Sequence, residues 1–227
     1  MRTRLNRFGY LPGQRPTTLL GIATKAGQPY DVEPWRYEGT EGMEFNAFAP
    51  GGSELYPPDV VDWVLVSIRV NPDHISTICR KSGLLMIDGT IVMTEAFDCC
   101  DLSEEEYYVV IEHRNHLPVM TPTPVKIDDS GTISFDFRSN QSYTRLFGNG
   151  QKEVNPGVFA MYAGNGDQVL TGASIKDINA NDLSLWTAEN GDHSGYYFQD
   201  YDLNGDVNVH DKAIWLTNNG VFTDVDR

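Results

Sequence analysis

Residues 200–211 have the composition and spacing of a calcium-binding loop. Six oxygen-bearing side chains stand at loop positions 1, 3, 5, 7, 9 and 12, and these are Asp200, Asp202, Asn204, Asp206, Asn208 and Asp211. Calcium takes about six to eight oxygen ligands, and Gly205 at position 6 permits the sharp turn that directs them inward, with a backbone carbonyl serving at position 7. The stretch therefore predicts a Ca²⁺ site. The alternative is a solvated turn rich in Asp, Asn and Gly, against which stand the apolar Val207 and the helical pattern of residues 209–216.

Position 12 of this loop is Asp211, where calcium-sensing loops usually carry glutamate. The shorter side chain reaches the ion less easily with both oxygens, which favours a structural ion in a calcium-rich medium over a cytosolic sensor. In this respect the loop resembles the dockerin variety of the site more than the calmodulin variety.

A second copy of the loop–helix pattern precedes the first. Residues 177–186 repeat the register of residues 206–215 at a constant offset, because 206 − 177 and 215 − 186 both equal 29. Such a repeat predicts two loop–helix units packed on each other, with Trp186 and Trp215 buried at equivalent places.

The two copies differ at the positions of the first ligands. Thr171, Ala173 and Ile175 stand six, four and two residues before Asp177. The candidate ligands of this loop are Asn165, Asp167, Asp177, Asn179 and Asp182, the first two reached through an insertion. Occupation of this first site stays open at the level of sequence.

The charge of the chain favours some partners and disfavours others. A net charge of −15 over 227 residues and an isoelectric point near 4.6 argue against nucleic acid and anionic membranes as partners. The same charge suits calcium loops and an extracellular location. Residues 1–30 hold five basic residues and no acidic one, so the remaining residues carry −15 − 5 = −20.

The three cysteines leave two alternatives open. Cys79 can form a bridge with Cys99 or Cys100, or all three can be reduced thiols. No apolar stretch of about 18 residues occurs, so we expect no membrane span, and any export signal is expected to be absent from this chain.

The strand signals predict a mainly β protein. Residues 60–70 form a nearly continuous β-branched and aromatic stretch, which predicts a strand buried on both faces. Residues 84–93 predict a hairpin closed by a two-residue turn at Asp88-Gly89, and residues 107–116 a further central strand. In residues 131–138, apolar and polar side chains alternate, as expected for a half-buried strand.

These elements, with no helix expected before about residue 178, predict an antiparallel, jelly-roll-like β-sandwich over residues 1–157. A small dockerin-like calcium-binding loop–helix module follows over residues 158–227. The Gly- and Pro-containing residues 149–157 are the expected linker.

Several motifs together resemble a known family. They are Gln28-Pro-Tyr30, Pro34-Trp35-x-Tyr37-x-Gly39-Thr40-Glu41, residues 60–66, Asp88-Gly89-x-Ile91-Val92, residues 109–117 and the terminal loops. The chain is similar to the calcium-binding C-terminal region of large secreted and cell-surface proteins of Bacteroidetes-type bacteria. The resemblance implies a β-sandwich followed by dockerin-like loops. Two features depart from the family: there is no sorting tail after Asp226, and Gly164 stands where the first loop is expected to open with an aspartate.

Residues 112–116 (Glu-His-Arg-Asn-His) are the strongest catalytic candidate. On one continuous strand His113 and His116 would point to opposite faces, so they could not share a metal unless the strand broke between them. We therefore expect structural roles: Arg114 paired with a carboxylate and Asn115 closing a turn. Four carboxylates crowd one segment, and these are Asp101, Glu104, Glu105 and Glu106. A carboxylate pair for glycoside hydrolysis is the alternative there, but a charge run of this kind is expected to form a solvated turn, and no catalytic residue is assigned.

The resulting hypothesis is a non-catalytic, calcium-stabilised structural module of a cell-surface adhesin or extracellular filament. Two alternatives from the binding class are a dockerin-type docking domain and a carbohydrate-binding module. The aromatic residues that could stack on sugar rings are Trp35, Tyr37, Tyr196 and Tyr197. The basic N-terminal arm, with apolar residues such as Leu5 and Phe8, is expected either to dock head to tail on another copy or to pair within its own sheet.

Overall fold

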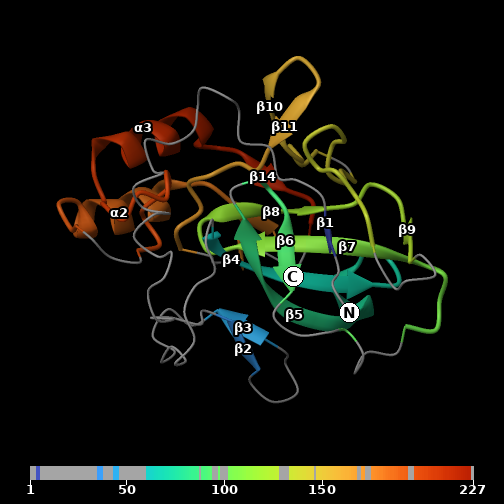
Figure 1. Ribbon diagram of the computed structural model, residues 1–227. Helices are drawn as coiled ribbons and strands as arrows, with labels where there is room; N and C mark the ends of the chain where they lie inside the picture. Colours follow the sequence, from blue (N-terminus) through green and yellow to red (C-terminus); the bar gives the residue numbers. More distant parts are fainter. Residues whose placement is uncertain are drawn as a thin grey trace.

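The protein, in a computed structural model, is mainly β, with one large antiparallel sheet and two α-helices in the part of the chain that is described (Figure 1). The structure describes residues 4–5, 35–37, 43–45, 60–86, 88–93, 97, 102–127, 133–145, 147–167, 170–171, 175–193 and 197–225. The seven strands of the sheet are β1 (Arg4–Leu5), β4 (Val60–Arg69), β5 (Thr77–Met86), β6 (Ile91–Met93), β7 (Glu106–His113), β8 (His116–Met120) and β9 (Val125–Lys126). Their order is β1-β6-β5-β4-β7-β8, with β9 also paired to β7. The mainly β, antiparallel prediction is confirmed; the jelly-roll arrangement stays a prediction.

Strand β4 is the centre of this sheet. It pairs with β5 on one side and β7 on the other, and every side chain from residue 61 to residue 69 is buried. A strand covered on both faces favours a largely apolar sequence, which explains why residues 60–70 show no regular polar alternation. The buried central strand predicted there is confirmed.

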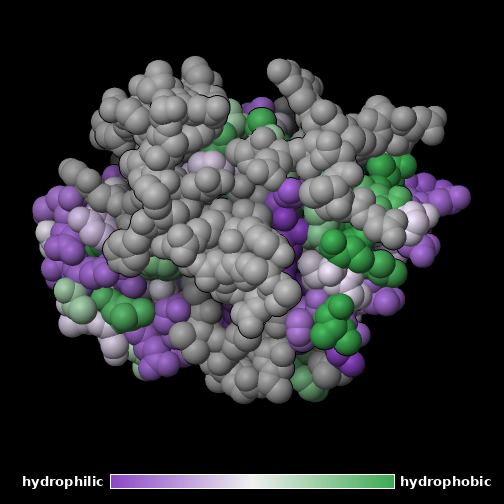
Figure 2. Space-filling view, turned by 90° about the horizontal axis from the view of Figure 1, so that it is seen from below, coloured by the Kyte–Doolittle hydropathy of each residue, from purple (hydrophilic) through white to green (hydrophobic). Residues whose placement is uncertain are grey.

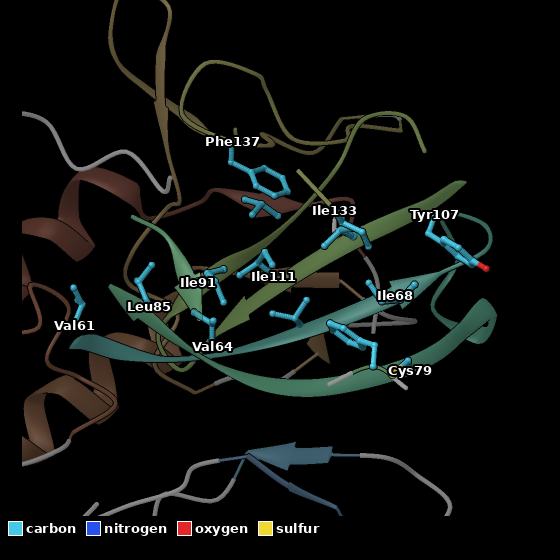
Figure 3. Packing of buried hydrophobic residues seen from close by; sticks show 14 of the residues in the cluster. Val61, Val64, Ile68, Cys79, Leu85, Ile91, Tyr107, Ile111, Ile133 and Phe137 are labelled. Atoms are coloured by element: carbon cyan, nitrogen blue, oxygen red, sulfur yellow. The ribbon is translucent and has the colours of Figure 1, made fainter. Parts of the chain in front are cut away.

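The main core lies on one face of the sheet. Its members include residues of β4, β5, β6 and β7 together with residues from outside the sheet, among them Ile133, Phe137 and Leu203. Figure 3 shows Ile133 and Phe137 on the same side of the sheet as Ile111 and Ile91. Leu203 is notable because it belongs to the candidate calcium loop and is nevertheless buried in this core.

The remaining elements surround the large sheet. Strands β2 (Trp35–Tyr37) and β3 (Met43–Phe45) pair with each other, and β2 contacts β4 and β5. The C-terminal part contains the hairpin β10 (Lys152–Asn155) and β11 (Val158–Ala160), the small sheet β12 (Leu170–Thr171), β13 (Ile175–Asp177) and β14 (Phe222–Thr223), and helices α2 (Ala180–Glu189) and α3 (Val209–Asn218). The two helices lie at one end of the large sheet (Figure 1). Among the described residues, no helix has the length and apolar content needed to cross a membrane.

The residues expected to be a linker form an ordered hairpin, β10–β11. Phe159 N donates to Arg138 O at 2.9 Å, and Lys152 Nζ donates to the buried Asn218 Oδ1 at 2.9 Å, so the hairpin joins the two parts of the chain. The division at residue 157/158 stays a prediction, but the parts on its two sides are in direct contact.

The hairpin at residues 84–93 is present, but its turn is one residue longer than predicted. Met86 N donates to Thr90 O and Gly89 N donates to Met86 O, both at 2.8 Å, which leaves three residues in the loop. Gly89 takes a φ of 83°, the left-handed conformation that completes a three-residue hairpin loop. Asp88 fixes this turn by accepting a hydrogen bond from Thr90 N at 2.9 Å.

The strand predicted at residues 131–138 is wrong for the described residues 133–138, which contain one isolated bridge, Ile127 with Ile133. The burial of Ile133 and Phe137 does follow the expected alternation. The backbone turns because the Asp136 carboxylate accepts from Arg138 N at 2.9 Å and the Asp136 carbonyl accepts from Asn140 N at 3.2 Å. Local bonds of this kind compete with strand pairing.

Cys79 is buried and disulfide-bonded, so the alternative with a bridge holds and the alternative with three free thiols does not. Its two possible partners, Cys99 and Cys100, lie outside the described residues. At the sheet edge, β1 pairs with β6 of the same chain, Arg4 opposite Val92. This is the intramolecular alternative for the N-terminal arm.

Candidate metal centre

Three carboxylates of the 200–211 loop converge in the structure. Asp200, Asp202 and Asp211 each offer an oxygen, and these oxygens lie within 4.8 Å of one another. Asp200 and Asp211 are buried, with 2% and 0% exposure, and Asp202 is half-buried. Among the described residues, this is the one such grouping of three acidic or metal-binding side chains.

The loop backbone wraps around Asp200. Its carboxylate accepts hydrogen bonds from Asn204 N at 2.8 Å and Gly205 N at 2.9 Å. This tight return needs left-handed backbone at two positions: Gly205 has a φ of 84°, and Leu203 has a φ of 62°. Leucine adopts this conformation at a cost, which the burial of its side chain in the main core offsets.

Asp211 closes the loop from the first turn of α3. Its Oδ1 accepts from Tyr201 N at 2.6 Å and Asp202 N at 3.1 Å, and its Oδ2 accepts from Asn208 N at 2.8 Å. Asn208 is the N-cap of α3 and accepts from His210 N at 2.8 Å, which completes a capping box. The residue at position 12 thus starts the helix and faces the carboxylate cluster at once.

The other candidate ligands of this loop have different surroundings. Asn204 Oδ1 accepts from Asp206 N at 2.8 Å within the loop. The Asp206 side chain is directed to His193, with Oδ1 3.3 Å from His193 Nδ1, so its backbone carbonyl is the group available at position 7. The amide oxygen of Asn208 is engaged as the helix cap.

Burial and mutual repulsion disfavour the ionised forms of these carboxylates when no cation lies between them. Burial raises the pKa of Asp202 to about 7, and the neighbouring charges of Asp211 and Asp200 act in the same direction. Burial likewise raises the pKa of Asp211 to about 6, against the opposing effect of its backbone hydrogen bonds. The pKa of Asp200 is also raised by burial, although Arg114 opposes the shift. Carboxylates held together in this way favour either a proton or a metal ion between them.

A buried ion network of the large sheet contacts the loop. Arg114 Nε donates to Asp62 Oδ2 at 3.0 Å, and Arg114 Nη2 lies 3.5 Å from Asp200 Oδ2. All three side chains are at most 3% exposed. The sequence predicted that Arg114 pairs with a carboxylate but did not identify Asp62, whose charge in a largely apolar strand was the available signal.

The strand predicted over residues 107–116 breaks at this network. Strand β7 ends at His113 and β8 begins at His116, so Arg114 and Asn115 form a turn. The two histidines face each other, with Nδ1 atoms 3.0 Å apart, instead of pointing to opposite faces. His113 Nε2 lies 3.2 Å from Asp62 Oδ2, and burial holds the pKa of His116 well below its usual value.

Asn115 connects this turn to both loops of the C-terminal part. Its side-chain amide donates to Asp200 O at 2.6 Å. Its backbone carbonyl accepts from Gly164 N at 3.0 Å and Asn165 N at 3.1 Å. The fully buried Asn115 therefore holds the opening residue of each candidate loop, and its predicted role in closing a turn extends to positioning both loops.

The first loop has the same frame with fewer acidic groups. Asp182 accepts from Asp167 N at 3.0 Å and from Asn179 N at 2.7 Å, as Asp211 does from Asp202 and Asn208. By this correspondence Asn165 occupies the place of Asp200, and burial raises the pKa of Asp182 to about 6. Asp177 accepts from Asn179 Nδ2 at 3.1 Å. In the first loop the charge of Asp167 adds to the rise in the pKa of Asp182, so two carboxylates interact there, where the second loop brings three together.

The two helices are joined by reciprocal hydrogen bonds. Trp186 Nε1 donates to Asn208 O at 3.0 Å, and Trp215 Nε1 donates to Asn179 O at 2.9 Å. Both tryptophans are buried, with 6% and 5% exposure. Each indole thus donates to the N-cap carbonyl of the other helix. The repeat predicted the equivalent burial of the two tryptophans, and the reciprocal hydrogen bonds are an addition from the structure.

The sugar-stacking aromatics find limited support. Tyr197 is partly buried against the cluster that contains both tryptophans, and its hydroxyl donates to His193 O at 3.3 Å. Trp35 and Tyr37 belong to β2, but their side chains, like Tyr196, lie outside the described residues. In Figure 2 the side of the molecule on which α2 and α3 lie is mainly hydrophilic, with a small hydrophobic group.

Comparisons with known proteins identify no family. No family model matches the chain, and a search of curated proteins finds no match. Among solved structures, a chain of an N-terminal interface mutant of a type II cohesin–X–dockerin complex from Acetivibrio cellulolyticus is 17% identical, with a TM-score of 0.38 over 72% of this chain and 82% of that one. A C-terminal interface mutant of the same kind of complex is 15% identical, with a TM-score of 0.37 over 70% and 82%. TM-scores this low identify neither the fold nor the function of this chain.

Proposed function

We propose that residues 200–211 bind Ca²⁺ and that the ion stabilises the C-terminal loop–helix pair. The observation that carries the proposal is the convergence of Asp200, Asp202 and Asp211 within 4.8 Å in a loop of calcium-binding spacing. Their side chains are largely withdrawn from water, and burial raises the pKa of all three, with repulsion from neighbouring cluster carboxylates adding to the shift at Asp202 and Asp211. A divalent cation would remove both penalties.

The donor set favours calcium over other ions. All the available groups are hard oxygens: three carboxylates, the Asn204 amide oxygen and the Asp206 carbonyl. Calcium takes about six to eight oxygens in irregular geometry, which these five groups can supply with a bidentate carboxylate or water, whereas magnesium requires a near-octahedral arrangement. Transition metals that prefer nitrogen or sulfur ligands find neither in the cluster.

Thermal unfolding with calcium and with excess chelator tests the proposal. Calcium should raise the temperature of the unfolding midpoint. At a calcium concentration 100 times the dissociation constant, the free energy of unfolding should increase by about 2.7 kcal/mol. Asp202→Ala should abolish the calcium-dependent shift. The matched control is Asp206→Ala, which should retain it because position 7 contributes a backbone carbonyl. Equal midpoints of the wild-type protein in calcium and in chelator would contradict the proposal.

The wider role that we propose is a non-catalytic structural module of an extracellular or cell-surface protein. The disulfide at Cys79 supports this location, because disulfides persist in oxidising compartments. The aspartate at position 12 supports weak binding of a structural ion. The calcium affinity tests this point. We expect a calcium dissociation constant of about 10⁻⁴ to 10⁻³ M, the range of extracellular modules. Submicromolar binding would instead indicate an intracellular buffer or sensor.

Assembly into a filament is a further part of this proposal. Strand β1 covers the edge of β6 with two residues, so the same edge could accept β1 from another copy, joining chains head to tail. Deleting residues 1–12 should then abolish any concentration-dependent increase in mass seen by light scattering. A full-length chain that is monomeric at high concentration, with and without calcium, would exclude the exchange.

A further inference from the structure

We propose that Arg114 is a resident cation that weakens calcium binding at the 200–211 loop, and that Asp62 sets the strength of this effect. The proposal rests on the proposed calcium site and deepens it. It assigns the affinity of the loop to Asp62 of β4 and to Arg114 of the turn between β7 and β8. Both residues lie more than 80 positions from Asp200 in the sequence.

The first step is the position of the guanidinium. Arg114 Nη2 lies 3.5 Å from Asp200 Oδ2, an oxygen of the carboxylate that also faces Asp202 and Asp211. A calcium ion among these carboxylates would therefore lie close to a fixed positive charge. Both side chains are at most 3% exposed, so solvent screens this repulsion only weakly.

The second step is the division of the guanidinium between two carboxylates. Arg114 Nε makes the shorter contact, 3.0 Å to Asp62 Oδ2, and the contact to Asp200 is long for a charge-assisted hydrogen bond. Asp62 is itself fixed, because its Oδ1 accepts from Trp63 N at 2.7 Å. Asp62 thus holds the guanidinium back from Asp200 and neutralises part of its charge.

The third step separates this role from that of a simple structural clamp. If Arg114 only oriented Asp200, removing it would weaken calcium binding. If Arg114 instead competes with calcium as a cation, its removal leaves the loop more negative and makes calcium binding tighter. The two residues then have opposite effects, because replacing Asp62 removes the carboxylate that makes the shorter contact with Arg114.

Calcium titrations of four variants test the inference, with calcium alone as the probe and the binding constant taken from the calcium-dependent shift of the unfolding midpoint. We expect Arg114→Gln to bind calcium roughly tenfold more tightly than the wild-type protein and Asp62→Asn to bind it several-fold more weakly. Arg114→Lys, which keeps the charge, should bind calcium within about threefold of wild type. It serves also as the second measurement if Arg114→Gln does not fold.

The matched control is Lys176→Met. Lys176 Nζ pairs with Glu112 Oε1 at 3.4 Å, and both side chains are at most 2% exposed, so its loss also leaves a buried carboxylate without its cation. This variant should lose stability but keep the wild-type calcium affinity. Unchanged or weaker binding by Arg114→Gln, or tighter binding by Asp62→Asn, would overturn the inference while leaving the calcium site intact. A wild-type protein that binds no calcium would overturn both.

Discussion

The two halves of the C-terminal repeat share a frame and differ in their candidate ligands. At the constant offset of 29 residues, N-cap Asn179 matches Asn208, and each helix begins with a capping box and ends before a glycine of positive φ, Gly191 or Gly220. Backbone pairing is also repeated. Ile178 N donates to Val221 O at 2.9 Å, and Val207 N donates to Asp192 O at 2.9 Å.

The ligand positions do not follow this repeat. Where the second loop has Asp200, the first has the buried Asn165, and the first loop also contains the strand pair β12–β13, which ends at Asp177. The helices, caps and tryptophans hold the repeat together through bonds that require no ion. The frame is therefore separable from the proposed cation site, since the first half keeps the same caps and indole hydrogen bonds with fewer acidic side chains.

The largest expected effect concerns the shared frame. Replacing Trp186 or Trp215 with alanine should each cost roughly 3–5 kcal/mol, since either change removes a buried aromatic side chain and a reciprocal hydrogen bond. Chemical denaturation with and without calcium measures both. Near-neutral values at both positions would show that the repeat has no energetic meaning.

The next effect concerns the difference between the halves. In excess calcium, Asp211→Asn should lose the calcium-dependent stabilisation, about 2–3 kcal/mol at saturating ion. Asp182→Asn removes the equivalent carboxylate of the first helix, so it should lower stability by the capping contribution of about 1 kcal/mol while keeping the calcium-dependent shift. Thermal scans of both variants in calcium and chelator separate these outcomes. Loss of the shift in both variants would mean that both loops bind the ion.

A smaller effect is the pH dependence of the calcium-free protein. The pKa of Asp202 is about 7 in the folded state and near 4 when unfolded, so between these values the folded state binds more protons. Stability in chelator should therefore fall as pH rises from 6 to 8, by about 1 kcal/mol after allowance for solvent screening. Excess calcium should remove or reverse this slope, because protons and calcium compete for the same oxygens. If the stability measured in chelator rose between pH 6 and pH 8, the raised pKa of Asp202 in the folded state would be contradicted.

The smallest effect lies at a position where the frame itself differs. Lys212 Nζ lies 5.1 Å from the centre of the Trp186 ring, whereas the residue 29 positions earlier is the apolar Leu183. Lys212→Ala should cost about 0.5 kcal/mol, the value of an exposed cation–π contact. Double-mutant cycles with Trp186→Phe measure the coupling, and zero coupling would show that the ammonium contributes nothing there.

The sequence was most informative where the signal is local. The offset between residues 177–186 and 206–215 predicted two helices with equivalent tryptophans, and the apolar stretch at residues 60–70 predicted the central strand. Caps, glycines and hydrophobic periodicity act within a few residues, so they can be read from one segment.

The errors fall where long-range contacts or side-chain turns decide the structure. The break between His113 and His116 depends on Asp62 and Asp200, which are distant in sequence. The turn at Asp136 arises because a side chain competes with strand pairing. Neither the long-range contacts of the histidine turn nor the turn at Asp136 produces a periodic pattern in the sequence. Asp62, a charged residue in the largely apolar stretch of β4, did indicate a buried partner.

Leu203 makes the 200–211 loop unsuitable for grafting. In a portable ion-binding loop, the side chains at its tip face solvent, so the segment can be moved to another scaffold without leaving a hole behind. Here the side chain between Asp202 and Asn204 fills space in the main core, and its left-handed backbone belongs to the loop. A chain cut after residue 157 would lose this leucine from the core and leave Arg114 without Asp200. Transplanting the loop should therefore fail in both directions: the donor would lose core packing, and the recipient would gain an exposed leucine.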